Sequence, residues 1–411
     1  MTASDEHALT VLFRQESGRL VAYLARMFGA HDLQTAEDVV QDTLFTALQA
    51  WRQGLPPDPA AWLFTVARRR ALDVLRRRKV RHGHGQVSLE SAELAAPADD
   101  DPTEDLLRMM FSCCHPSLTD DTQTALILHL VCGFGSVEVA RAFFVEPGAM
   151  EKRLSRAKNV LAAEGALCEV ATPEETRKRL SAVMQAIYLM FDAGYHGSLA
   201  PEPVQLDVAA DAIRIADLLA ESRATSTPAA HALAALTCLH GARLPARFAR
   251  GALVPLDEQD RATWDPELVA LGMRHLAASA TGSDLTVFHL EAGIAAQHAA
   301  ASSIDTTDWP EIVRLYGLLY QRKHTPVVAL SYLIARARLH GPKQGIAELL
   351  ALEGKERLER YPFYWAALGD LAFRAGDTDS AQGWLMRGLA SARTDGERAM
   401  FTRRIASCRP S

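Results

Sequence analysis

The stretch PAAWLFTVARRRALDVLRRRK, residues 59–79, decides how the rest of the chain is interpreted. Its first half is apolar and aromatic, whereas its second half carries seven cations against one acid, Asp73. Neither proline nor glycine interrupts it after Pro59, so it is predicted to form one helix with proline in its first turn. Aromatic rings beside phosphate-seeking cations favour an interaction with partly single-stranded nucleic acid. A solvated basic helix with a buried tryptophan is the alternative.

Composition supports a multidomain helical protein with a segregated charge pattern. The 411 residues are 48% hydrophobic, and the formal net charge is -6. Residues 1–85 contain twelve Lys and Arg against nine acids, whereas residues 86–120 contain eight acids and one base. A basic head followed by an acidic connector makes nucleic acid a plausible partner for the head alone.

The cysteines and the apolar runs indicate a soluble cytoplasmic protein without a membrane partner. The six cysteines form no CxxC pair, which favours reduced thiols. No signal peptide is visible, and no apolar run approaches the ~20 residues that span a bilayer. Cys113, Cys114 and His115 suggest a metal site, but they lack the usual ligand spacing of zinc sites. No metal or cofactor is therefore expected.

A second helix is predicted just before the basic one, over residues 36–51. Its apolar positions are predicted to face inward: Val39, Val40, Thr43, Leu44, Leu48 and Trp51. This arrangement leaves Asp38, Gln41 and Asp42 exposed together. Such a patch is usually only a solvated face, but its position beside the basic helix also favours docking to another protein. The proline-rich loop RQGLPPDP, residues 52–59, is predicted to be rigid.

Residues 119–163 are predicted to form three helices, of which the last two resemble a helix-turn-helix. In the first of this pair, Val137, Ala140 and Phe144 are predicted to face inward. In the last helix the predicted apolar stripe contains Met150, Leu154, Ala157 and Leu161, and the cations point outward. An ordinary helical hairpin with a cationic face is the alternative.

From residue 173 onward the pattern predicts successive helices. Near the end, several residues stand at the offsets of a tetratricopeptide repeat: Trp365, Leu368, Gly369, Ala372, Ala381, Leu385 and Gly388. Gly341 and Pro342 match Gly376 and Asp377 in a weaker repeat about 35 residues earlier. Repeats of this kind stack into solenoids that bind peptides or helices.

These segments resemble extracytoplasmic-function sigma factors. Residues 36–48 resemble region 2.2, residues 61–77 resemble regions 2.3 and 2.4, and residues 136–158 resemble region 4.2. The resemblance extends to the group with a C-terminal tetratricopeptide-like extension, through GLPPDPAAWL, CCHPSL, YLMFDAGYHGS, DEQDRATWD, AAQHAAA, DTTDWPEIVRLYGLL and TPVVAL. Departures occur at Arg69, Glu151, Glu258 and Ser331, where relatives more often have Asn, a basic residue, Asp and Asn.

The resemblance implies an all-α fold in four parts. These are a region 2 bundle at residues 1–82, an acidic linker at 83–118, a region 4 helix-turn-helix at 119–170 and a helical extension at 173–411. Sigma factors have no catalytic activity of their own, and their partners are core RNA polymerase and promoter DNA. Asp38, Gln41 and Asp42 would then dock on the clamp helices of the largest polymerase subunit.

The resemblance also assigns residues to the two promoter elements. The minus-10 set contains the loop residues Arg52, Gln53, Gly54 and Asp58, the rings of Trp62 and Phe64, which could instead be core, and the phosphate-binding Arg68, Arg69, Arg70, Arg76 and Arg77. The minus-35 set contains Ala149, Glu151, Lys152 and Arg153 near base edges, and Arg156 and Lys158 on the backbone.

The role of the extension is open at this point. It could regulate the sigma domains in cis or bind a regulatory protein or peptide. Tyr188, Phe191, Gly194 and Tyr195 are the candidate contact with the sigma domains, although they could equally be a helix end buried within the extension. The alternative function is a DNA-binding regulator with a ligand-binding or peptide-binding domain that never joins polymerase. A hydrolase has little support, since no GxSxG, HExxH or P-loop motif is present.

Overall fold

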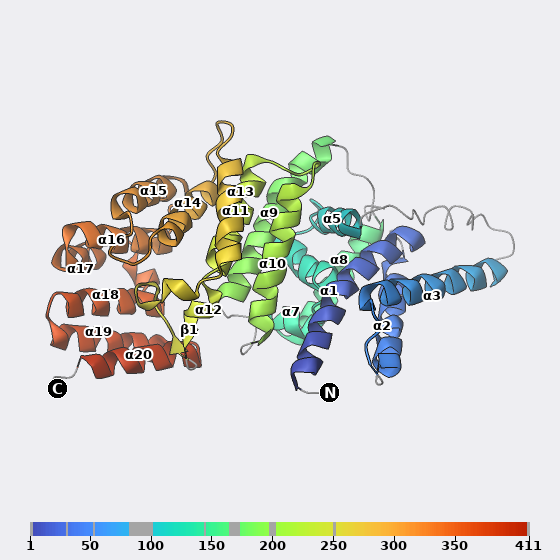
Figure 1. The fold of residues 1–411 in the computed structure, drawn as a ribbon, viewed down its shortest axis with the longest axis horizontal. Coiled ribbons are helices and arrows are strands. Elements are labelled where there is room, and N and C mark those ends of the chain that lie inside the picture. Colours follow the sequence, from blue (N-terminus) through green and yellow to red (C-terminus); the bar gives the residue numbers. More distant parts are fainter. Residues whose placement is uncertain are drawn as a thin grey trace. The chain divides into compact units, whose positions relative to one another are not determined.

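Helices account for nearly all the regular structure in the computed structural model, which confirms the all-α prediction (Figure 1). The structure describes residues 3–29, 32–51, 54–81, 102–143, 145–163, 173–196, 203–249 and 252–408. The chain divides into two units, residues 1–226 and 227–411. Arg52, Gln53, Phe144 and most of the acidic stretch lie outside the described residues.

The first unit is built from helices, of which α1 is the longest. Its elements are α1 (Ala3–Phe28), α2 (Leu33–Ala50), α3 (Pro59–Arg81), α5 (Pro102–Cys113), α6 (Asp120–Leu126), the π-helical turn η3 (Ile127–Val131), α7 (Ser136–Ala142), α8 (Pro147–Ala163), α9 (Pro173–His196) and α10 (Pro203–Glu221). Helix α1 packs against α2, α3, α5 and η3, and buries Leu20 and Leu24. Gly18 permits this packing, because a Cβ atom there would lie 1.9 Å from the carbonyl oxygen of Val131.

Three helices bear on the four parts expected from the sequence, whose bounds stay a prediction. Helix α5 falls within the span assigned to the acidic linker, yet its Leu106, Met109 and Met110 are buried against the first unit. Acid content dominated that assignment, whereas the apolar stripe of α5 decides its packing. Helices α9 and α10, which were assigned to the extension, also belong to the first unit.

Most of the predicted inward positions of α2 and α7 are buried, with two exceptions. Val39, Val40, Thr43 and Trp51 are buried, Leu44 is half-buried, and Ala140 of α7 is buried. The prediction is wrong for Leu48 and Val137, which are 52% and 46% exposed. Helix α2 packs on α1 and α3, and its buried stripe passes through Ala47, so the next position, Leu48, is turned toward solvent.

The second unit is a succession of short helices with one two-stranded hairpin. Its elements are α11 (Pro228–Gly241), α12 (Leu244–Arg247), β1 (Phe248–Ala249), β2 (Ala252–Leu253), η4 (Leu256–Glu258), η5 (Arg261–Thr263), α13 (Pro266–Ser279), α14 (Val287–Ala300), α15 (Trp309–Arg322), α16 (Pro326–His340), α17 (Pro342–Leu350), η6 (Lys355–Arg357), α18 (Pro362–Arg374), α19 (Thr378–Ser391) and α20 (Asp395–Ser407). The antiparallel strands pair Phe248 with Leu253.

Side-chain caps fix where these helices begin. Asp265 accepts hydrogen bonds from the backbone N–H groups of Glu267 and Leu268, and Thr325 accepts one from Val328. Proline at the first helical positions of α13, α15 and α16 has the φ angle that a helix start needs. The stretches DEQDRATWD, DTTDWPEI and TPVVAL therefore encode helix starts.

Helices α18 and α19 form a close hairpin. Gly369 lies against Leu385, because a Cβ atom at Gly369 would be 2.7 Å from Leu385 Cγ. Gly341 and Gly376, which the sequence analysis matched to each other, both have positive φ, 94° and 81°. The two glycines therefore share the same backbone conformation, while membership of the tetratricopeptide family stays a prediction. No helix within the described ranges combines the length and apolar character needed to cross a membrane.

Candidate functional site

The solvent face of α2 carries the predicted docking residues. Asp38, Gln41 and Asp42 are all exposed, because the opposite face of the helix is buried against α1 and α3. Phe45, one turn after Gln41, is 61% exposed and continues the same stripe with Leu48. The sequence analysis missed Phe45. The signal was its position four residues after Gln41 on the exposed face.

Helix α3 presents most of its cations to solvent. Arg68, Arg69, Arg76 and Arg77 are exposed, and in Figure 1 the C-terminal end of α3 extends beyond α1 and α2. Within the described chain, Arg69 and Arg77 have no hydrogen-bond or ion-pair partner. Arg70 differs, because it donates to Asp42 at 3.3 Å and to Thr46 at 2.7 Å and so links α3 to α2.

The two predicted base-contacting rings of α3 are half-buried in ring pairs. Trp62 lies edge-on to Trp51, with ring centroids 5.3 Å apart, and Phe64 lies edge-on to Tyr23 at 5.7 Å. Burial raises the pKa of Tyr23, and the guanidinium of Arg68 partly opposes that shift. Both rings thus help to fix α3 on its neighbours.

The loop before α3 is open where the structure describes it. Gly54 has a φ of 135° and nothing within 4 Å of a Cβ position, so its conformation is one that other residues rarely adopt. Asp58 accepts a hydrogen bond from the backbone N–H of Ala61 at 2.9 Å and thereby caps α3.

Helices α7 and α8 are joined by a short connection, and α8 buries its predicted stripe. Met150, Leu154, Ala157 and Leu161 are buried. The opposite surface exposes four of the predicted DNA-contacting residues: Ala149, Glu151, Lys152 and Arg156. Arg153 is half-buried. Lys158 differs from the rest of the set, because its side chain is already engaged within the protein.

Glu37 of α2 is the residue that engages Lys158. Lys158 Nζ donates to both carboxylate oxygens of Glu37, at 3.0 and 2.8 Å. The Nε2 atom of His129, in η3, lies 3.0 Å from Glu37 Oε1. Burial alone would raise the pKa of Glu37, but the hydrogen bonds and charges of His129 and Lys158 hold it below its usual range.

The aromatic residues of α9 lie inside the first unit. Phe191, Gly194 and Tyr195 are buried, Tyr188 is half-buried, and the rings of Phe191 and Tyr195 are stacked at 5.5 Å. Helix α9 packs against α5, α6 and α10. The Sγ atom of Cys132 lies 3.3 Å from the sulfur of Met190, one residue before Phe191.

Comparisons with known proteins show which protein family this chain resembles. Residues 12–81 match the model of sigma-70 region 2, and residues 179–280 match a family of unknown function, DUF6596. An uncharacterized protein, R00370 of Rhizobium meliloti, is 34% identical over 94% of this chain and 91% of its own length. The ECF RNA polymerase sigma factor SigL of Mycobacterium tuberculosis is 27% identical over 39% of this chain and 89% of SigL. This chain belongs to the extracytoplasmic-function sigma factors with a C-terminal extension. No solved structure matches it.

The buried thiols of this sigma factor are poor metal ligands. Cys113, Cys114 and Cys132 are buried, and burial raises the pKa of Cys114 to about 12. A metal ligand must be a thiolate, which this environment disfavours. The ring Nδ1 of His115 accepts a hydrogen bond from the backbone N–H of Ser117. The geometry therefore favours a structural role for Cys113, Cys114 and His115.

In the extension, residues 257–265 form a loop whose charged side chains have partners from distant helices. Glu258 accepts hydrogen bonds from Arg403, at 2.5 Å, and from Arg404, at 2.7 and 2.9 Å. Asp257 lies 3.2 Å from a guanidinium nitrogen of Arg338. Arg404 also approaches Asp370, at 3.8 Å. The loop is thereby joined to α16 and α20, and Arg404 also links it to Asp370 of α18.

A cationic cluster surrounds His298 of α14. Arg261 donates to the backbone oxygens of His298 and Ala301, at 2.9 and 2.8 Å. The rings of His298 and Trp309 are 5.6 Å apart, and Arg338 lies over the ring of Trp309. Burial, together with the charges of three nearby arginines, Arg243, Arg261 and Arg338, lowers the pKa of His298 to about 3. His298 is therefore neutral at physiological pH.

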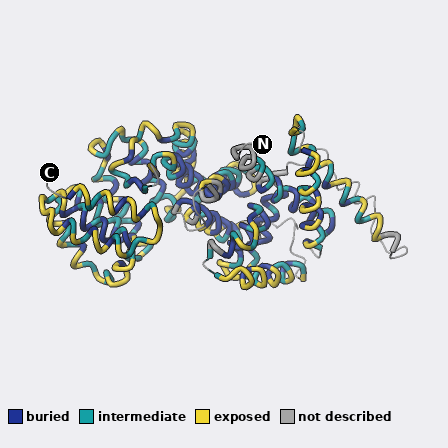
Figure 2. Tube along the Cα trace, turned by 90° about the horizontal axis from the view of Figure 1, so that it is seen from below, coloured by how far each residue is buried: buried dark blue, intermediate teal, exposed yellow. Residues whose placement is uncertain are grey.

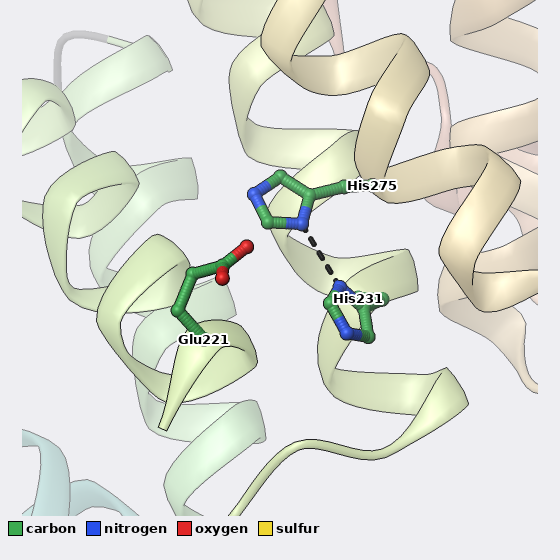
Figure 3. A group of neighbouring side chains, drawn as sticks. All are labelled: Glu221, His231 and His275. Atoms are coloured by element: carbon green, nitrogen blue, oxygen red, sulfur yellow. Dashed lines mark hydrogen bonds between the residues drawn. The ribbon is translucent and has the colours of Figure 1, made fainter. Parts of the chain in front are cut away.

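A histidine pair also lies in the second unit, where the sequence showed only scattered histidines. The Nδ1 atoms of His231 and His275 are 2.9 Å apart (Figure 3), so one ring must donate and the other accept. Figure 3 also draws Glu221, the last residue of α10 in the first unit. The pair arises from the packing of α11 on α13, which no local sequence pattern reveals.

Proposed function

We propose that this sigma factor directs core RNA polymerase to specific promoters and assists promoter melting in the cytoplasm, without catalytic activity of its own. The observation that carries the proposal is the adjacency of two exposed surfaces in the region 2 segment. Asp38, Gln41 and Asp42 form a polar docking face on α2, and the free cations Arg69 and Arg77 lie on the neighbouring α3. Phe45 and Leu48 supply apolar area to the docking face.

The minus-10 element would be bound by α3 and the loop before it. Arg68, Arg69, Arg70, Arg76 and Arg77 would hold phosphates, and Arg52, Gln53, Gly54 and Asp58 would border the pocket for a flipped base. Extruding a base costs a few kcal/mol, which the preformed loop and the cations must offset. The ring contacts of Trp62 and Phe64 support the role of core residues that fix the helix.

The minus-35 element would be read by the start of α8 in the major groove. Ala149, Glu151, Lys152 and Arg153 would reach base edges, while Arg156 and Lys158 would hold the backbone. Glutamate can accept a hydrogen bond from the amino group of cytosine, so exposed Glu151 would alter the specificity seen in relatives with a basic residue there.

The extension would regulate the sigma segments in cis. Support comes from α9, whose Phe191, Gly194 and Tyr195 are buried within the unit that contains the sigma segments, with Tyr188 beside them. The second unit would remain available to a regulatory protein or peptide. A regulator that binds DNA without joining polymerase is the alternative function, and it has no use for the exposed docking face of α2.

Transcription reconstituted from purified parts tests the proposal. The full chain would be combined with core polymerase from a bacterium that encodes it and supplied with a genomic promoter library. We expect transcription from a small set of promoters, and its loss when Asp38, Gln41 and Asp42 are all changed to alanine. Intact DNA binding without any promoter-specific transcript would support the alternative regulator.

A further inference from the structure

The carboxylate of Glu37 joins three segments that are far apart in the sequence. Helix α2 supplies Glu37, η3 supplies His129, and α8 supplies Lys158, 121 residues away. Building on the proposed function, we propose that Glu37 is the centre of an autoinhibitory contact that holds the minus-35 helix against the region 2 segment in the free protein. Lys158 would then be unavailable to the promoter backbone until the contact opens.

Glu37 has two hydrogen-bond partners, the ring of His129 and the ammonium of Lys158. The Nδ1 atom of His129 lies 2.8 Å from the carbonyl oxygen of Phe134, and its Nε2 atom lies 3.0 Å from Glu37. The ring of His129 thus bridges the carbonyl of Phe134 and the carboxylate of Glu37, which also accepts hydrogen bonds from the ammonium of Lys158.

This contact is shielded from water. The side chains of Glu37, Lys158 and His129 are 11%, 18% and 21% exposed. Such charges are screened by salt much less than surface pairs are. Removing the charge of Glu37 would leave Lys158 in a poorly solvated place without its partner, which favours its departure from α2.

Helix α10, which the sequence assigned to the extension, supports the same arrangement through its contact with Arg14. Arg14 of α1 lies 3.5 Å from Asp211 of α10, and its guanidinium carbon lies 4.7 Å from the ring centroid of Phe134. Gly133, in the same turn, approaches the backbone of Arg14 so closely that a Cβ atom would lie 2.5 Å from its oxygen. Because the carbonyl of Phe134 also binds His129, α10 stabilises the turn that orients the Glu37 contact.

Distances along DNA show why the contact must open. By the positions in their names, minus-35 and minus-10, the two promoter elements would lie about 25 base pairs apart, which is roughly 85 Å of duplex at about 3.4 Å per base pair. Helix α3 has 23 residues and α8 has 17, so even end to end they span only about 60 Å. With α8 held on α2, which packs against α3, the chain cannot reach both elements at once.

A distance measurement between α2 and α8 tests the contact in the full chain. Spin labels would be attached at Gln49→Cys and Asn159→Cys, both exposed, in a Cys168→Ser background, because the other five cysteines are buried. We expect one short distance in the parent protein and a second, longer population in Glu37→Gln. Glu146→Gln makes the same charge change at an exposed residue just before α8 and should keep the short distance.

Binding to a random-sequence duplex measures the release of Lys158. Glu37→Gln should bind several-fold more tightly than Glu146→Gln, with a salt slope steeper by about 0.9 for one added phosphate contact. If Glu37→Gln does not fold, His129→Gln removes one partner and should give the same changes to a smaller extent. Distance distributions identical in all variants would overturn the autoinhibitory contact. A distance change without transcription by any variant would overturn only the proposed function.

Discussion

Helix α3 of the first unit and the loop of residues 257–265 in the second unit are both dense in charge, yet they use that charge differently. Arg69 and Arg77 of α3 are exposed and have no partner among the described residues. In the loop, Asp257 and Glu258 pair with arginines of α16 and α20. Figure 2 shows buried and exposed residues alternating along the helices of each unit. The loop's charges hold the fold together, whereas Arg69 and Arg77 of α3 remain available to a ligand.

This difference shows what a conspicuous motif can mean. Both stretches contribute to the resemblance to sigma factors, but only α3 has charged side chains, Arg69 and Arg77, without a partner among the described residues. In the loop, Gln259 donates to the backbone oxygen of Val254, and Asp260 and Asp265 cap helices. We infer that the loop motif specifies architecture. The partner of each charge, and not the density of charge, separates the two cases.

The largest effect is expected when a partner of the loop is removed. Arg404→Met would leave Glu258, Asp257 and Asp370 without their shared cation in a site where Arg404 is only 15% exposed. Because Glu258 and Asp257 are partly exposed and keep Arg403 and Arg338, the cost should be about 2 to 3 kcal/mol. Urea unfolding of the full chain, followed by circular dichroism, measures the loss.

Arg77→Met on α3 is the matched control and should change the free energy of unfolding by less than about 0.5 kcal/mol. Equal effects of the two changes would contradict the distinction between structural and available arginines.

A pH dependence is expected from His298, which the arginines of this region surround. Because burial and Arg243, Arg261 and Arg338 lower its pKa to about 3, the folded chain stays unprotonated where the unfolded chain, with a pKa near 6.5, takes up a proton. Stability is therefore full above pH 6.5 and falls toward pH 3, by about 1.4 kcal/mol per pH unit. Urea unfolding at pH 6.5, 5.5 and 4.5 measures this slope.

His298→Gln should remove about 2 kcal/mol of the loss between pH 6.5 and 4.5, because the unfolded histidine is already half protonated at pH 6.5. Exposed His324 offers a comparison in the same unit, since His324→Gln should leave the slope as it is. A slope that is the same in both variants would show that His298 is not held neutral.

The sequence predicted the features that depend on local pattern. The stripe of α8, with Met150, Leu154 and Leu161, is buried as expected, because helical periodicity determines it. The proline at the start of α3 was equally readable, because it acts within one turn of its own position. The exposure of Asp38, Gln41 and Asp42 followed from the same periodicity.

Pairings between distant residues were not predictable. Glu37 and Lys158 are 121 residues apart, and Glu258 and Arg404 are 146 apart. Neither pair leaves a periodic or local signal, since their contact depends on how whole helices pack. For the same reason the sequence placed Lys158 among the free DNA-binding residues, whereas the structure engages it with α2.

Substitution of the exposed arginines of α3 is expected to change DNA binding more than it changes the stability of the fold. Changing Arg69 and Arg77 together to alanine should lower the affinity for a single-stranded oligonucleotide about tenfold, because two phosphates lose their cations. The slope of log affinity against log salt should fall by about 1.4, at about 0.7 per phosphate. Fluorescence anisotropy over a KCl series measures both.

Arg322 and Arg360, two exposed arginines of the second unit, provide the control pair. Their double change to alanine should leave affinity and slope unaltered. A similar loss in both double variants would indicate attraction by net charge alone, and α3 would lose its special status.

The smallest effect is expected at Glu258. Glu258→Asp shortens the side chain by one methylene group and weakens contacts that are now 2.5 to 2.9 Å long. Because Glu258 is 36% exposed, water and salt screen the pair, and the cost should be at most about 1 kcal/mol in urea unfolding. Asp257 and Asp370 still hold Arg404 after this change. A loss as large as that of Arg404→Met would mean that Glu258, and not the shared cation, organises the loop.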